Sequence, residues 1–299
     1  MIRMLDDVNN WAIPIDHTLD RYFNKDNYFT WMAFNILVSN IDTNAQNFYL
    51  YSPQNSETWY FLPWDYDGAF VRARAATEQD FRISDIDQGF SYYWGAVLHR
   101  RVLMVPEYRQ RLDDKVTALM AWLTPARITD ILTTDRRVTD QFVTQMPDVY
   151  YLPGTYQLYD REYGLIPGEI QINYQLYRDG LTKPMPFYLG VPQDLGTELK
   201  FNWDEAYDFE GQDITYHLVI STGWDFQDIV RDVTVLNTTE VRVSYLTPST
   251  YFWKVTATNE TGNHQGPFDS YIDSDGQPHF GMKYLYIAPD GRILEKGTE

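Results

Sequence analysis

The spacing of the hydrophobic residues changes once along this chain of 299 residues, near residue 195. Before that point apolar residues such as Phe29 and Ala33 recur at the spacing of a helix with one buried face. After it they alternate, as in Leu199, Phe201 and Trp203, which is typical of strands buried on one side. The change predicts an α+β multidomain protein: a mostly helical part with one β-hairpin, then an all-β immunoglobulin-like sandwich.

Turn-forming and polar segments set the expected boundaries. Residues 17–39 and 94–123 are expected to be helical, with Asp26 capping the first helix, and residues 71–90 to be irregular. Proline and glycine interrupt residues 150–192, so only a short helix or strand is expected there, over residues 169–179. The predicted division is a helical domain over residues 1–165, a linker over 166–192, a sandwich over 193–287 and a tail over 288–299.

Charge and cysteine content exclude several classes of function. The chain carries 42 acidic against 24 basic residues and a formal net charge of -18, so nucleic acid and anionic membranes are not expected partners. A nucleotide could still bind, because a divalent metal ion can bridge its phosphates to carboxylates. The chain has no cysteine, which excludes disulfides and thiolate sites. No apolar run is long enough to predict a membrane span.

Two short segments carry the strongest chemical signal. Asn40 begins the sequence N-I-D-T-N-A-Q-N-F-Y-L-Y, and Trp59 begins W-Y-F-L-P-W-D-Y-D-G. The first offers a carboxylate at Asp42 and an amide at Asn47, and the second offers further carboxylates after a predicted hairpin. Phosphoryl-transfer enzymes use this layout to hold a nucleophile and metal ions.

These segments, with Leu19 and Asp20 before them, resemble the CotH family of spore-coat-type protein kinases. The helices to about residue 150, including the stretch P-E-Y-R from Pro106, are also similar to the C-terminal half of that family's catalytic domain. The resemblance implies a kinase-like C-terminal lobe that uses ATP with magnesium or manganese.

The resemblance also implies roles for individual residues. Asp42 takes the position of the catalytic base, while Asn47 and Asp65 take those of the metal-binding amide and aspartate. Asp67 is either a further metal ligand or a hydrogen-bond acceptor that supports the ligands without touching the metal. Trp64 either packs against the nucleotide or fills the core.

Two departures from ordinary protein kinases stand out. Asn40 replaces the histidine that those enzymes have two positions before the catalytic aspartate. No glycine precedes Gly68, so a phosphate-covering loop is not found upstream. The expectation is that the N-terminal lobe is absent, and that the chain alone is weakly active or inactive.

A second resemblance covers residues 195–275. Trp203 and the stretch L-T-P-S-T-Y-F-W-K-V-T-A from Leu246 are similar to fibronectin type III modules. Such modules commonly act outside the cell as spacers or binding units, which favours an extracellular, cell-surface or spore-surface location.

Two acidic turns have two alternative interpretations. Each is either a structural calcium site or an ordinary turn exposed to solvent. They are Asp208-x-Glu210-Gly211-x-Asp213 and Asp273-x-Asp275-Gly276.

The prediction for function is a CotH-like kinase that transfers the ATP γ-phosphate to Ser or Thr of surface or coat proteins. Two alternatives stay open. One is a non-catalytic scaffold or adhesion protein with a kinase-like fold, and the other, suggested by the aromatic content of 16%, is a carbohydrate-associated protein.

Overall fold

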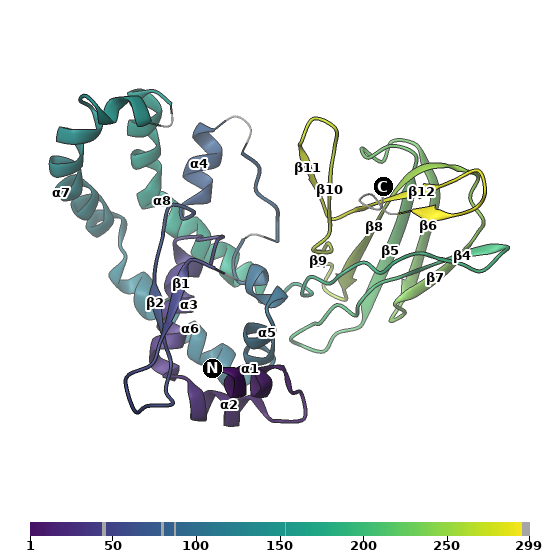
Figure 1. Cartoon of the computed structure of the whole chain (residues 1–299), viewed down its shortest axis with the longest axis horizontal. Helices are drawn as coiled ribbons and strands as arrows, with labels where there is room; N and C mark the ends of the chain where they lie inside the picture. The colour runs from purple at the N-terminus through teal and green to yellow at the C-terminus, as the bar shows by residue number, and fades with distance from the viewer. Residues whose placement is uncertain (44–45, 79–80, 87, 153, 295–299) are drawn as a thin grey trace. The chain divides into compact units, whose positions relative to one another are not determined.

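The computed structural model describes residues 1–43, 46–78, 81–86, 88–152 and 154–294 (Figure 1). The chain divides into two compact units, Met1–Gly180 and Leu181–Glu299. The first is mostly helical with one hairpin, and the second contains antiparallel sheets, which confirms the α+β multidomain prediction. The division lies at the end of a helix that begins inside the predicted first domain and runs through the first half of the segment expected to be a linker.

Most of the first unit is helical. Its helices are α1 (Ile2–Asn9), α2 (Ile15–Tyr22), α3 (Lys25–Leu37), α4 (Val71–Thr77), α5 (Val97–Leu103), α6 (Pro106–Trp122), α7 (Pro125–Val143) and α8 (Tyr156–Gly180). Two 3-10 turns, η1 (Ser91–Gly95) and η2 (Asp148–Tyr151), and the strands β1 (Phe48–Tyr51) and β2 (Tyr60–Pro63) complete it. No helix in the described part of the chain is long and apolar enough to cross a membrane.

The helix expected over residues 17–39 is two helices, because the chain is extended at Phe23 and Asn24. Asn24 caps α3 by accepting a hydrogen bond from the Asn27 amide at 2.9 Å, so the prediction of Asp26 as the cap was wrong. The break lets Trp59 form backbone hydrogen bonds on both sides of it. The Trp59 amide donates to the Tyr22 carbonyl, and the Trp59 carbonyl accepts from the Asn24 amide. Trp59 therefore attaches the segment before β2 to the helices.

Two further helices differ from the sequence prediction. The expected irregular stretch over residues 71–90 begins with α4, and α8 runs for 25 residues through Pro167. Glu169 of α8 helps to explain both helices. Its carboxylate accepts hydrogen bonds from the backbone amides of Arg72 at 3.0 Å and Ala73 at 2.8 Å. These bonds cap α4 and hold α8 beyond its proline, and neither could be inferred from neighbouring sequence.

The predicted hairpin is present. Strands β1 and β2 pair antiparallel from Phe48↔Pro63 to Tyr51↔Tyr60, and β2 lies against α3 (Figure 1). Phe61 is 2% exposed, and its ring centroid lies 4.5 Å from that of Trp31 on α3. The hairpin is thus fixed to α3 by one aromatic face, which sets the positions of the loops at its two ends.

The second unit contains two main antiparallel sheets. One has the order β3-β4-β7, and the other has the order β13-β12-β8-β5-β6, with β9 paired to β8. The strand bounds are β3 (Gln193–Asp194), β4 (Glu198–Asn202), β5 (Ile214–Ser221), β6 (Ile229–Leu236), β7 (Glu240–Ser244), β8 (Ser249–Asn259), β9 (His264–Gln265), β12 (Lys283–Ile287) and β13 (Ile293–Leu294). A separate hairpin joins β10 (Ser270–Ile272) to β11 (Pro278–Phe280).

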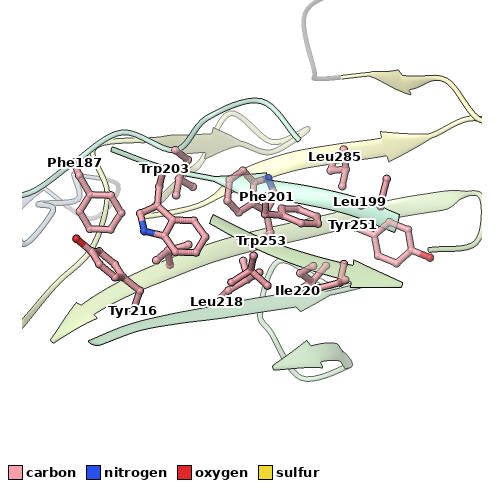
Figure 2. Close-up of a cluster of buried hydrophobic side chains, with 14 of the residues drawn as sticks. Phe187, Leu199, Phe201, Trp203, Tyr216, Leu218, Ile220, Tyr251, Trp253 and Leu285 are labelled. Atoms are coloured by element: carbon pink, nitrogen blue, oxygen red, sulfur yellow. The ribbon is translucent and has the colours of Figure 1, made fainter. Parts of the chain in front are cut away.

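Both main sheets contribute to one hydrophobic core (Figure 2). Phe201 of β4 and Trp253 of β8 are fully buried, with ring centroids 5.0 Å apart. The alternation read from the sequence at Leu199, Phe201 and Trp203 therefore marks core-facing positions, as predicted. Strand β13 lies in the segment expected to be a tail and extends the larger sheet.

Candidate active site

Two segments meet beside the hairpin of the first unit. Asp42 lies in the loop after α3, Asn47 precedes β1, and Asp65 and Asp67 follow β2. Asn47 and Asp65 both adopt left-handed backbone conformations, with φ of 57° and 54°. Such conformations are uncommon outside glycine, and they persist where the surrounding structure enforces them. The hairpin thus places both constrained polar residues beside its open end, where Phe48 pairs with Pro63.

Asp42 is the point at which the two sequence segments meet. The Asn47 amide nitrogen donates to Asp42 Oδ2 at 3.4 Å. From the other side, a Cβ atom at Gly68 would lie only 2.5 Å from the same oxygen, so the backbone of the Asp65–Gly68 turn packs directly against the carboxylate. Gly68 is required here for this close approach, not for its backbone angles. The structure therefore brings together the loop and the turn that the sequence keeps over 20 residues apart.

The carboxylates in this region repel one another. The negative charge of Asp67 is the largest cause of a raised pKa at Asp65, followed by partial desolvation, the contact with the Asp67 side chain and the charge of Asp42. Asp65 and Asp67 are exposed, and Asp42 is half-buried. A divalent cation held at this face would remove the repulsion, so the donor set fits a metal ion.

The fit depends on more than carboxylates. Within the described residues, no group of three or more His, Asp or Glu side chains could hold a metal ion. The Asn47 amide supplies the missing type of donor. Because its nitrogen faces Asp42, its oxygen points away from that carboxylate and can serve a cation. A cation here would use Asp65, Asp67 and Asn47, and phosphate oxygens would complete its coordination.

Trp64 does not fill the core, so that alternative was wrong. The side chain is 54% exposed, and its ring lies edge-on to Tyr49 of β1, with centroids 5.1 Å apart. An exposed indole directly before Asp65 remains available to a ligand bound at the carboxylates.

Sequence reasoning missed the residues that hold the Asp42 loop in place. Thr43 is fully buried, and its hydroxyl donates to the Asn40 carbonyl at 3.0 Å and contacts the Tyr93 hydroxyl at 2.8 Å. The Asn40 amide nitrogen donates to Asn35 Oδ1 at 3.3 Å. The available signal was Asn35 itself, an asparagine between apolar residues near the end of a predicted helix.

The two acidic turns of the second unit have the hydrogen bonding of ordinary turns. Asp208 accepts from the amides of Glu210 at 2.8 Å and Gln212 at 3.3 Å. Asp273 accepts from two backbone amides and pairs with His279 Nε2 at 2.9 Å. These contacts favour the solvated-turn alternative over a calcium site.

The family comparison agrees with the geometry. A family model described as CotH kinase protein matches residues 1–177, which is more than half of the chain. The chain belongs to the CotH kinase family. No curated protein matches it. The family match ends within α8, so Glu169 lies inside the CotH region, although it falls outside the helical domain first expected to end at residue 165.

Proposed function

We propose that the CotH unit binds ATP with magnesium or manganese and transfers the γ-phosphate to Ser or Thr hydroxyls of a protein substrate. The observation that supports this most directly is the meeting of Asp42, Asn47 and the Asp65–Gly68 turn at one carboxylate. Kinase-family membership supports the use of ATP and a divalent metal in general.

Each side chain has a chemical role in this proposal. Asp42 Oδ orients the acceptor hydroxyl and takes its proton as the new oxygen–phosphorus bond forms and the bond to the ADP oxygen breaks. The amide of Asn47 holds the Asp42 carboxylate from one side, and Gly68 limits its movement on the other. Asp65, Asp67 and the Asn47 amide oxygen would hold the metal ion, which when bound neutralises charge on the phosphates. Trp64 offers an aromatic surface to the nucleotide.

A calorimetric titration of Mn·ATP tests this function. We expect the chain to bind and Asp65→Asn to weaken binding at least tenfold, because it removes a charged metal ligand. Asp42→Asn should retain binding but lose the weak phosphate transfer that is the most expected of the unaltered chain. Asp130→Asn, a matched change at an exposed aspartate of α7, should behave as the unaltered chain. Equal binding by the unaltered chain and Asp65→Asn would disprove the proposed metal site.

We also propose that the second unit is a fibronectin type III-like module. The Tyr251 hydroxyl donates to the Thr247 carbonyl at 2.8 Å, a tyrosine corner at the start of a core strand. Leu246 and Trp203 are both 4% exposed, as expected for the residues that carry the resemblance. The module would display the CotH unit on a cell or spore surface, where the protein substrate would lie. Surface labelling of intact cells and spores tests that location, and protection of the protein from the label would contradict it.

A further inference from the structure

Asn35 of α3 is a buried amide that helix formation alone does not explain. It is 1% exposed and stands between the apolar residues Phe34 and Ile36. Its nitrogen donates to the Trp31 carbonyl at 2.8 Å, a local bond within the helix. A buried amide is costly unless both of its ends are bonded. The partners of its oxygen therefore indicate what the residue does.

Those partners lead to Asp42. Asn35 Oδ1 accepts from Asn40 Nδ2 at 3.3 Å, and the Asn35 carbonyl accepts from the Asn40 backbone amide at 3.0 Å. Asn40 is 2% exposed, and its own Oδ1 accepts from the Asp42 backbone amide at 3.4 Å. Two bonds thus fix Asn40 to α3, and Asn40 in turn fixes the start of the Asp42 segment.

The same pair also reaches the turn that carries the metal-binding aspartates. The Cβ position at Gly68 lies 3.3 Å from Asn40 Oδ1, so this oxygen packs against the turn as well as against Asp42. Tyr66, between the two aspartates of the turn, lies on α3 with its ring 5.8 Å from that of Phe34. Adjacent residues of α3 thus hold the two sides: Phe34 packs against Tyr66, and Asn35 bonds Asn40.

We propose that Asn35 is a positioning residue that sets the separation between Asp42 and the Asp65–Asp67 turn through Asn40. The inference rests on the proposed function, because that separation matters only if both sides act on one ligand. Asn35 touches neither substrate nor metal. Its effect is to keep two loops, which adjoin the open end of the β1–β2 hairpin, in register with one helix.

The test compares two buried asparagines by Mn·ATP calorimetry. We expect Asn35→Leu to weaken binding by about 10–100-fold, the effect typical of residues that orient metal ligands. Asn259→Leu is the matched control: Asn259 is 5% exposed and also donates to a backbone carbonyl, that of Thr182 at 2.9 Å, but it belongs to the second unit. Equal weakening in the two variants at equal loss of thermal stability would overturn the proposal.

A second variant guards against misfolding of Asn35→Leu. Asn40→Ala leaves α3 unchanged and removes the amide that bonds Asn35 Oδ1 and faces Asp42 and Gly68. We expect it to weaken Mn·ATP binding as Asn35→Leu does. In the double variant the two effects should not add, since both changes act through one contact. Full additivity would contradict a shared role.

Hydrogen exchange separates this inference from the proposed function. In Asn35→Leu, peptides covering residues 40–43 and 66–70 should both exchange faster than in Asn259→Leu, whether or not the chain binds Mn·ATP. Faster exchange in both peptides without any Mn·ATP binding would support the positioning role and reject the kinase site. Unchanged exchange in residues 66–70 would reject the positioning role.

Discussion

The two units differ in how many polar side chains they bury. Among the described residues, the buried polar side chains of the first unit are Thr18, Asn35, Ser39, Asn40, Thr43, Ser84, Ser91, His99, Arg101, Glu169 and Asn173, against Ser221, Asn259 and Gln265 in the second. In the first unit, Asn40 and Thr43 form hydrogen bonds that hold the Asp42 loop, while Glu169 bonds the start of α4 and Asn173 the end of α3. In the second unit, the hydrophobic cluster is built from apolar and aromatic side chains. A core that only holds sheets together can be almost wholly apolar, whereas a core that also positions loops must bury amides and carboxylates.

At neutral pH, the largest effect on this comparison is expected at Glu169. Glu169→Gln should lower the free energy of unfolding of the first unit by about 1–3 kcal/mol, because an amide cannot accept both α4 backbone donors. Burial raises the pKa of the Glu169 carboxyl, and the two donors oppose that shift. Urea unfolding followed by circular dichroism at the helix band reports the first unit, which contains the helices of the described chain.

Glu107→Gln serves as the control for Glu169, since that residue is exposed in the first turn of α6. We also expect Glu169→Gln to weaken Mn·ATP binding, because α4 follows the Asp65–Gly68 turn after two residues. An unchanged free energy of unfolding in Glu169→Gln would show that the cap on α4 contributes nothing to stability. The contrast between the buried polar groups of the two units would then lose its main example.

The contrast also explains which features could be predicted from sequence. Short-range patterns were sufficient to predict the hairpin and the alternating strands around Phe201. They were also sufficient to predict that the polar residues from Asp42 to Asp67 flank the hairpin. They failed where a distant residue decides the local structure. Glu169 caps a helix 97 positions away, and the Trp59 backbone separates α2 from α3. Apolar periodicity is local, whereas a buried hydrogen bond across the fold leaves no periodic signal.

The next effect is a dependence of stability on pH at His99. This histidine lies among the rings of Tyr28, Trp31 and Tyr93, and burial lowers its pKa from 6.5 to about 3. Below about pH 6.5 the unfolded chain takes up a proton that the folded chain does not. The free energy of unfolding should therefore fall by about 1.4 kcal/mol per pH unit between about pH 6 and pH 3.

Chemical unfolding of the unaltered chain and His99→Asn at several pH values measures this contribution. The asparagine retains a polar atom near the position of His99 Nδ1, which lies 2.7 Å from the Tyr28 hydroxyl, but it cannot titrate. The difference in stability between the two chains should shrink as the pH falls. A constant difference from pH 7 to pH 4 would mean that His99 is not held neutral by burial.

The smallest expected effect is at Tyr251, and it tests whether the second unit depends on a polar bond at all. Tyr251→Phe removes the hydroxyl that donates to the Thr247 carbonyl at 2.8 Å and should destabilise the second unit by about 1 kcal/mol. Tyr284→Phe, on β12 with its ring stacked on Tyr271, is the matched change outside the corner. Hydrogen exchange of β8 amides measures the loss locally. The CotH unit should bind Mn·ATP equally in both variants, because it contains the whole proposed site. Weaker binding in Tyr251→Phe alone would show that the second unit also supports the site, and the two units could then no longer be treated as separate in function.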